Sequence, residues 1–227
     1  MIPKIIHYCW FGGKEKPRLM QKCVASWRRF APDFQLIEWN EGNFDVDAAP
    51  FTRDAYADGN YAFVSDYARA KALQAMGGVY LDTDMELLRP LDEFLGWKLF
   101  AGFEPGDFVA CGIIGSVPGH ALWEAYLRHY DGANYWNADG SRFCASNVPM
   151  FTSLLEQRGL ARDGSYQCLD GIAAYPPAVF YPLDYRTGRL RVTPETAAIH
   201  HYAASWLPWQ KRIVPWLKKQ AGRFLPR

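Results

Sequence analysis

Hydrophobic residues follow two different periods in the first part of the chain. The segment Ile2–Trp10 is rich in Ile, Tyr and Trp and stops at Gly12-Gly13, a pattern that predicts a buried strand followed by a turn. Apolar residues then recur at helical spacing over Arg18–Phe30, which predicts a helix with one buried face. A second short strand is predicted over Gln35–Trp39. This strand–helix–strand order predicts an α/β fold with a mostly parallel central sheet flanked by helices.

The clearest local signals lie in the middle of the chain. Ser65 is expected to cap a helix over Asp66–Met76, which is rich in Ala and Leu. Gly77-Gly78 is expected to end that helix. The apolar residues Val79–Leu81 then predict a short strand that leads directly into Asp82-Thr83-Asp84.

The remaining segments carry weaker patterns. Residues 40–60 are polar and are expected to form a loop, and the segment from Ala174 onward, rich in Pro, Tyr and Phe, has no clear period. We find no internal repeat or low-complexity linker, so we expect one domain over residues 1–205 and a C-terminal extension over residues 206–227. Further strands are predicted over Leu99–Phe103, Cys111–Ser116 and Ile199–Tyr202, and further helices over Ala121–His129 and Met150–Arg158.

Composition excludes several classes of function. The 227 residues include 25 basic and 24 acidic side chains, a balance that excludes disorder and argues against a nucleic-acid partner. No apolar run of about eighteen residues is present, and the N-terminus lacks the pattern of a signal peptide. The five cysteines are widely spaced and never form CxxC, which predicts reduced thiols. We therefore expect a cytoplasmic protein.

Basic and aromatic residues are concentrated at the C-terminal end. Residues 206–227 contain six basic residues and no acidic one, together with several large apolar side chains. This combination suits contact with an anionic membrane surface, which predicts a peripheral location at the inner face of the cytoplasmic membrane. Packing of this segment on its own domain is the alternative. The apolar residues concerned are Trp209, Trp216, Phe224 and Leu225.

The pair Asp82 and Asp84 is the main candidate for chemistry. In an extended chain residues i and i+2 face the same side, so both carboxylates converge at the end of a predicted strand. Open α/β sheets bind ligands at the carboxyl ends of their strands. A carboxylate pair there suits a divalent cation, which in turn would neutralise a diphosphate. The D-x-D pattern is common by itself, and we interpret Asp45-Val46-Asp47 as solvated loop because no apolar strand precedes it.

The helix before this pair supplies a second candidate. Asp66 and Arg69 are separated by three positions and lie on the same helix face. Taken alone they are more simply a surface ion pair. The functional interpretation is that Asp66 accepts hydrogen bonds from sugar hydroxyls while Arg69 holds an anionic or polar group.

Three blocks of the sequence resemble a known family. The central block runs from Phe63-Val64-Ser65-Asp66-Tyr67-Ala68-Arg69 to Gly77-Gly78-Val79-Tyr80-Leu81-Asp82-Thr83-Asp84, and the others cover residues 5–13 and 200–206. They are similar to glycosyltransferase family 32, DXD-containing sugar transferases that include mannosyltransferases and bacterial capsule or lipopolysaccharide enzymes. They also resemble the glucosyltransferase domain of the large clostridial toxins. The resemblance implies a GT-A fold, a nucleotide-sugar donor, Mn²⁺ or Mg²⁺, and retention of anomeric configuration.

The resemblance also assigns roles to the candidate residues. Trp10 would stack on the nucleobase, and Asp66 and Arg69 would contact the ribose and the donor sugar. Asp82 would contact the sugar and the metal, and Asp84 would bind the metal directly. These roles make Asp82, Asp84 and Arg69 the expected catalytic residues.

The C-terminal block completes the expected site. His201 would bind the metal or the diphosphate, because neutral imidazole is a competent ligand. His200 is the alternative, since adjacent residues of an extended segment point in opposite directions. Ser205 and Trp206 would hydrogen-bond and cover the diphosphate. Asn147 would bind the donor sugar, with a plain helix N-cap as its alternative.

The expected function is metal-dependent, retaining transfer of a hexose from a nucleotide diphosphate sugar. A UDP-sugar is favoured as donor over GDP-mannose, and the acceptor is a hydroxyl of a glycan or lipid-linked glycan in surface polysaccharide synthesis. Two alternatives are a non-catalytic module that binds nucleotide-sugar or glycan and a toxin-like enzyme that glycosylates protein. A glycosidase is less suitable, because its two carboxylates must flank the sugar about 5–9 Å apart.

Overall fold

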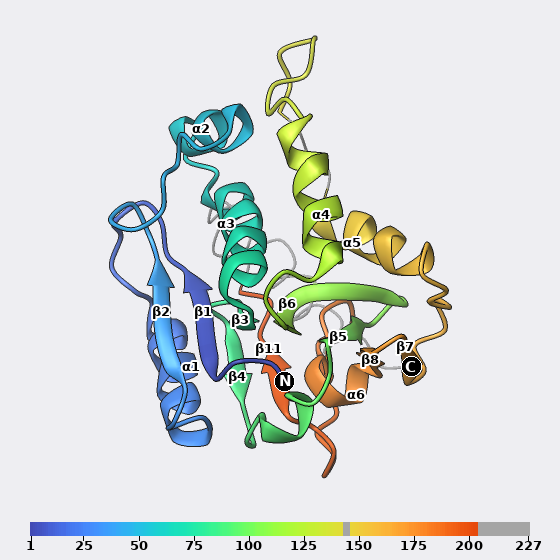
Figure 1. The fold of residues 1–227 in the computed structure, drawn as a ribbon. Coiled ribbons are helices and arrows are strands. Elements are labelled where there is room, and N and C mark those ends of the chain that lie inside the picture. The colour runs from blue at the N-terminus through green and yellow to red at the C-terminus, as the bar shows by residue number, and fades with distance from the viewer. Residues whose placement is uncertain (143–145, 204–227) are drawn as a thin grey trace, which may run out of the picture.

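A central sheet of seven strands organises the molecule (Figure 1). The computed structural model describes residues 1–142 and 146–203. Five strands run in one direction, while β6 (Phe108–Ser116) and β7 (Gln167–Leu169) run in the opposite direction, so the expected mostly parallel sheet is confirmed. The order across the sheet is β2 (Gln35–Trp39), β1 (Ile5–Cys9), β3 (Gly78–Leu81), β6, β5 (Leu99–Glu104), β8 (Ile172–Tyr175) and β7.

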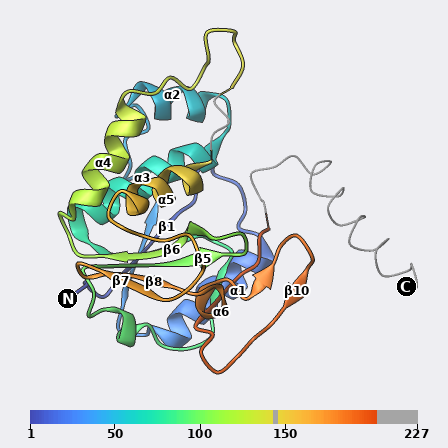
Figure 2. The same ribbon diagram turned by 90° about the vertical axis from the view of Figure 1, so that its right-hand side faces the viewer.

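Helices cover both faces of this sheet (Figure 2). On one face lie α3 (Tyr61–Met76), α4 (Ala121–Asp131) and α5 (Asn147–Glu156), with α2 (Pro50–Ala57) packed on α3 and α4. On the other face lie α1 (Arg18–Phe30) and the short α6 (Pro177–Phe180). None of the helices in the described part of the chain has the length and apolar character that crossing a membrane requires.

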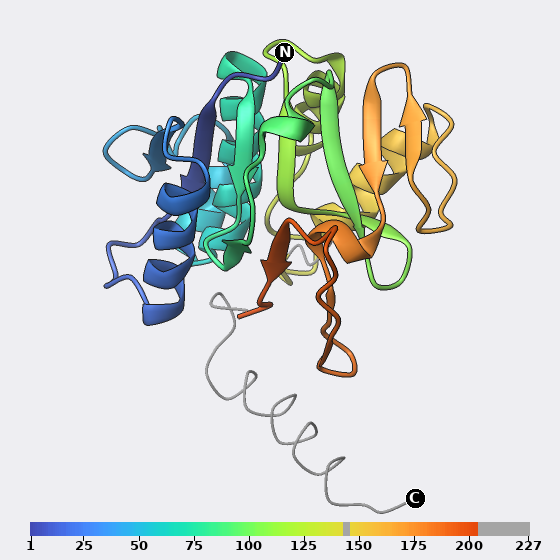
Figure 3. The same cartoon turned by 90° about the horizontal axis from the view of Figure 1, so that it is seen from below.

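Two short ribbons lie outside the central sheet. In one, β4 (Met85–Leu87) pairs antiparallel with β11 (Ala198–His200). In the other, β9 (Leu183–Asp184) and β10 (Arg189–Leu190) form a hairpin that projects next to β11 (Figure 3). A 3₁₀ turn, Asp92–Phe94, follows β4.

The alternation of side chains along the strands builds a core on each face. In β3, Tyr80 packs in the core under α3 and α4, whereas Val79 and Leu81 pack in the core under α1. Period-2 alternation therefore sends the two sets to opposite faces. Trp123 and Trp27 are fully buried anchors of the first and second core, respectively.

Most predicted elements form close to the expected positions, with two corrections in the α2–α3 region. Residues 40–60 are not all loop, because α2 begins with Pro50 at its first turn and buries Phe51 and Ala55. The α3 helix begins at Tyr61, so Ser65 does not cap it. The Ser65 hydroxyl instead donates to the Tyr61 carbonyl, the back-bonding that a serine inside a helix makes.

The predicted C-terminal extension over residues 206–227 lies outside the described residues, and so does Ser205.

The cysteines in the described part of the chain are free thiols, as expected: Cys9, Cys23, Cys111 and Cys168.

The link from α3 to β3 is made by two glycines. Gly77 and Gly78 have φ of +63° and +100°, the left-handed region that favours glycine. A Cβ on Gly77 would lie 2.7 Å from the Pro118 nitrogen and 2.8 Å from the Ser116 carbonyl oxygen. The Gly77 carbonyl accepts a hydrogen bond of 2.8 Å from buried His7. This crowded link fixes the helix relative to the strand that precedes Asp82.

Gly77→Ala is expected to lower the free energy of unfolding by about 1–3 kcal/mol, because it combines backbone strain with contacts to backbone atoms that cannot move away. Gly159→Ala is the matched control, since Gly159 has φ of +96° but no atom within 4 Å of an added Cβ. Urea denaturation of both variants measures the difference. Equal losses in the two variants would show that crowding at Gly77 contributes nothing.

Candidate functional site

Asp82 and Asp84 lie in the turn between β3 and β4. The Asp82 amide donates to the Gly112 carbonyl of β6 at 2.8 Å, which ties the turn to the end of the sheet. The side chains of Asp82 and Asp84 are 29% and 16% exposed. Both carboxylates are therefore partly withdrawn from water, at the carboxyl end of β3 where the sequence predicted them.

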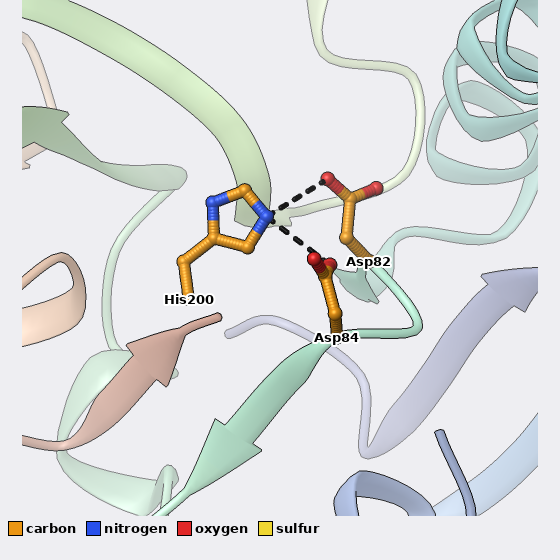
Figure 4. Close-up of side chains that lie close together, drawn as sticks. All are labelled: Asp82, Asp84 and His200. Carbon is orange, nitrogen blue, oxygen red and sulfur yellow. Dashed lines mark hydrogen bonds and ion pairs between the residues drawn. The ribbon is translucent and has the colours of Figure 1, made fainter. Parts of the chain in front are cut away.

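Pairing of β4 with β11 brings a histidine to these carboxylates. His200 lies opposite Met85 in the ribbon, one position from Asp84. Its Nε2 donates to Asp84 Oδ1 at 3.1 Å and lies 4.0 Å from Asp82 Oδ2 (Figure 4). One ligand atom from each of these three residues lies within 4.8 Å of the others, which is a spacing suited to a metal ion. We call Asp82, Asp84 and His200 the carboxylate–histidine cluster.

His200, and not the expected His201, lies next to Asp84. His201 points to the other side of the ribbon, where its Nε2 donates to Glu86 Oε2 at 2.8 Å. Glu86 is also paired with Lys22 at 2.8 Å. Adjacent residues of β11 do point to opposite sides, as expected. The register of β11 against β4 decides which of them faces Asp84, and it puts His200 there.

The charges in the cluster stabilise one another. Burial by itself raises the pKa of Asp84, but His200 and the Ala203 amide, which donates to Asp84 Oδ2 at 2.7 Å, lower that pKa to about 2. Burial lowers the pKa of His200, and the Asp84 carboxylate outweighs this effect and raises it. His200 Nδ1 is buried and has no hydrogen-bond partner among the described residues. The cluster thus holds an ionised carboxylate that attracts positive charge.

Arg69 lies beside the cluster and is not at the surface. Its side chain is 4% exposed, and Nη2 contacts Asp82 Oδ1 at 3.0 Å and Asp66 Oδ1 at 3.3 Å. The guanidinium also lies 4.2 Å above the Tyr80 ring. The surface ion-pair interpretation is therefore wrong. Nε and Nη1 are buried without partners in the described part of the chain, a costly arrangement that a polar ligand would relieve.

Asp66 and Asn147 extend the site from Arg69 toward α5. The Asn147 amide donates to Asp66 Oδ1. Ser146, and not Asn147, caps α5, because its hydroxyl accepts from the Val148 amide at 3.3 Å. Burial raises the pKa of Asp66 to about 7, against the opposing effect of Arg69. The structure therefore brings Asp66, Arg69 and Asn147 together, three residues expected from the sequence to contact the donor.

Trp10 follows β1 at the same end of the sheet. It is partly buried, and its indole Nε1 donates to the Lys14 carbonyl at 2.8 Å. Its backbone amide donates to the Trp39 carbonyl at 2.9 Å, which continues the pairing of β1 with β2. Stacking of Trp10 on a nucleobase remains a prediction.

Three further residues lie near the cluster that are not among those expected from the sequence: Glu104, Tyr185 and Tyr202. Glu104 ends β5, and the Tyr202 hydroxyl donates to its Oε2 at 3.4 Å. The Tyr202 ring lies 4.1 Å from the His200 ring and 4.9 Å from the Tyr185 ring. Glu104 could have been found from the sequence, because it directly follows the predicted apolar strand Leu99–Phe103, just as Asp82 follows Val79–Leu81. Tyr185 lies in a segment without a clear hydrophobic period. Tyr202 ends the predicted strand Ile199–Tyr202, but β11 ends at His200 and Tyr202 turns away with φ of +49°.

The model of a protein family described as a glycosyltransferase sugar-binding region containing a DXD motif matches residues 17–100. The chain is 28% identical to an α-1,4-N-acetylglucosaminyltransferase of Homo sapiens, over 71% of this chain and 44% of the human protein. It is 29% identical to a mannosyl phosphorylinositol ceramide synthase of Saccharomyces cerevisiae, over 68% of this chain and 42% of the yeast protein. The chain spans less than half the length of either relative.

A solved structure with the same fold is that of the PaToxG glycosyltransferase. It superposes with a TM-score of 0.52 at 16% identity, over 69% of each chain. At this identity the similarity concerns the fold, which is of the GT-A type. The matched region includes Arg69 and both carboxylates of the carboxylate–histidine cluster. Over residues 17–100 the chain is therefore similar to the sugar-binding region of the DXD-containing glycosyltransferases.

Proposed function

We propose that this enzyme transfers a hexose from a nucleoside diphosphate sugar to a hydroxyl of a glycan or lipid-linked glycan, with retention of anomeric configuration. The observation that carries the proposal is the convergence of Asp82, Asp84 and His200 beside the buried Arg69. Surface polysaccharide synthesis at the inner face of the cytoplasmic membrane is the setting that such an acceptor suggests.

The cluster fits a divalent cation as cofactor. Carboxylate oxygens suit Mn²⁺ and Mg²⁺, and the imidazole of His200 favours Mn²⁺, because Mg²⁺ prefers an all-oxygen set. The lowered pKa of Asp84 and the position of His200 Nε2 between the two carboxylates support binding of a cation here. When bound, the cation would stabilise negative charge on the departing diphosphate.

Arg69, Asp66 and Asn147 supply the polar contacts for the donor. The two unpaired donors of Arg69 suit phosphate or sugar oxygens, and the guanidinium remains charged at all working pH values. A sugar hydroxyl both donates and accepts, so it matches the neighbouring carboxyl of Asp66 and amide of Asn147.

Retention of the anomeric configuration requires the acceptor hydroxyl to attack on the same face of the donor sugar that the diphosphate leaves. The acceptor proton would then pass to the departing diphosphate. A covalent intermediate needs a carboxylate nucleophile on the face of the sugar opposite the departing group. The carboxylates around the cluster in the described part of the chain are instead assigned to the metal and the two substrates: Asp82 and Asp84 to the metal, Asp66 to the donor and Glu104 to the acceptor.

The relatives do not fix the donor, because one is named for N-acetylglucosaminyl transfer and the other for mannosyl transfer. We favour a UDP-sugar over GDP-mannose, and a glycan acceptor over the protein acceptor of a toxin-like enzyme.

Incubation with UDP- and GDP-sugars is expected to reveal slow hydrolysis of one donor that requires Mn²⁺ and stops in EDTA. Asp84→Asn should lower this hydrolysis at least about a hundredfold, because the loss of a metal ligand removes several kcal/mol of charge stabilisation. Asp47→Asn is the matched control, since Asp47 belongs to the exposed second D-x-D sequence. A folded wild-type protein that hydrolyses no donor would refute the proposal.

His200→Ala is expected to weaken Mn²⁺ at least about tenfold, as judged from the Mn²⁺ dependence of donor hydrolysis and of the melting temperature. His201→Ala is expected to leave both unchanged, because His201 contacts Glu86 on the other side of the ribbon. The reverse result would restore His201 as the ligand and exclude His200.

Asp66 is expected to make stability depend on pH. Its pKa is raised from 3.8 to about 7, so the folded chain binds a proton that the unfolded chain releases, and stability falls as pH rises through this range. Relative to Asp66→Asn, the wild-type free energy of unfolding should therefore decrease between about pH 4 and pH 7. Urea denaturation across this range measures the slope. Asp170→Asn, at an exposed turn, is the control and should keep the wild-type dependence of the free energy of unfolding on pH. If Asp66→Asn also kept this dependence, Asp66 would be excluded as its cause.

A further inference from the structure

A group of three side chains flanks the carboxylate–histidine cluster on the side away from Arg69. Arg69 and His200 approach different oxygens of Asp82, Oδ1 at 3.0 Å and Oδ2 at 4.0 Å. Beyond His200, the rings of Tyr202 and Tyr185 follow at successive centroid distances of 4.1 and 4.9 Å. None of these aromatic groups is used by the donor contacts proposed above.

Tyr202 is held in an unusual backbone conformation. Its φ is +49°, which is rare for a bulky residue and costs about 1–3 kcal/mol. Strain of this kind persists where the surrounding structure enforces it, and it concentrates at functional sites. Here it turns the chain sharply after β11, so that the Tyr202 hydroxyl reaches Glu104 while the ring stays against His200.

Tyr185 is placed by the β9–β10 hairpin, which projects next to β11 (Figure 3). The Asp184 carboxylate accepts from the backbone amides of Arg186 at 2.8 Å and Thr187 at 3.3 Å, and the Asp184 carbonyl accepts from Gly188 at 2.7 Å. These bonds make the turn compact. Tyr185 is nevertheless 44% exposed, so part of an aromatic ring on an ordered turn is available to a ligand.

An exposed tyrosine beside a half-buried carboxylate is suited to a sugar. The apolar face of a hexopyranose packs on an aromatic ring, which offers a large rigid surface at low entropic cost. The ring hydroxyls need hydrogen-bond acceptors close by, and Glu104 Oε1 and Oε2 provide them next to Tyr202.

We propose that Tyr185, Tyr202 and Glu104 form the acceptor subsite of this enzyme, where a terminal hexopyranose stacks on Tyr185 and donates a hydroxyl to Glu104. This inference rests on the proposed transferase function. It places the two substrates on opposite sides of the cluster, with the donor sugar toward Arg69 and the acceptor toward Tyr202.

The test uses the full chain, the donor selected by the hydrolysis screen, and p-nitrophenyl glycosides of glucose, galactose, mannose and N-acetylglucosamine as acceptors. Transfer to glycoside and transfer to water are measured in the same reaction. Wild-type enzyme is expected to use at least one glycoside. Tyr185→Ala should raise its KM about tenfold, the effect of losing one aromatic contact, and lower the ratio of transfer to hydrolysis correspondingly.

Variants separate stacking from a structural role. Tyr185→Phe keeps the ring and should retain a KM close to wild type, whereas Glu104→Gln should lower kcat/KM for the glycoside. Tyr166→Ala removes another exposed tyrosine, which packs on Tyr175 away from the cluster, and should change neither reaction.

Each outcome decides the inference. An unchanged KM in Tyr185→Ala, or a parallel loss of hydrolysis and transfer, would overturn the acceptor subsite. Wild-type hydrolysis without transfer to any glycoside would exclude a hexopyranose acceptor at Tyr185 while leaving the transferase proposal intact. Absence of metal-dependent hydrolysis in the wild type would instead refute the proposed function itself.

Discussion

The antiparallel pairing of β4 with β11 joins two segments that lie far apart in the sequence, since 116 positions separate Asp84 from His200. Backbone pairing fixes register, and a slip of one residue would exchange the faces of His200 and His201. The register is held by burial of Ala198 and by the bond of 2.7 Å from the Trp27 indole to the Met85 carbonyl. The composition of the carboxylate–histidine cluster therefore depends on packing in the core under α1.

The charged side chains at the site are largely buried, so each depends on a neighbour of opposite charge. Arg69 is enclosed, and its contacts with Asp82 and Tyr80 offset the cost of removing a guanidinium from water. His200 likewise offsets the cost of burying the Asp84 carboxylate. The pKa of His200 is raised because of the negative charges around it. Metal ligation requires a neutral imidazole, so a cation that binds here competes with the proton on His200. The same potential that raises the pKa of His200 would also attract a divalent cation.

Local signals in the sequence were sufficient where an element is determined by its own residues. The α1 helix and β2 occupy the predicted ranges, because helical spacing and a short apolar run specify them without help from distant segments. The α2 helix was missed, because a helix of eight residues depends on tertiary burial of Phe51 and Ala55 rather than on its own propensity. Asp82 and Asp84 could be predicted because they directly follow an apolar strand.

The rest of the site could not be predicted for a related reason: it is assembled by long-range pairing. Tyr185 and Tyr202 reach the cluster only through the β9–β10 hairpin and the turn after β11, which leave no periodic pattern in the sequence. These segments surround His200, whereas Arg69 of α3 contacts Asp82, and Asp66 of α3 and Asn147 of α5 follow behind it. The residues proposed for the donor thus belong to regular elements that packing makes rigid. Those proposed for the acceptor belong largely to turns, whose sequence can change with little cost to the core. An enzyme built in this way can keep its donor chemistry while its acceptor specificity diverges.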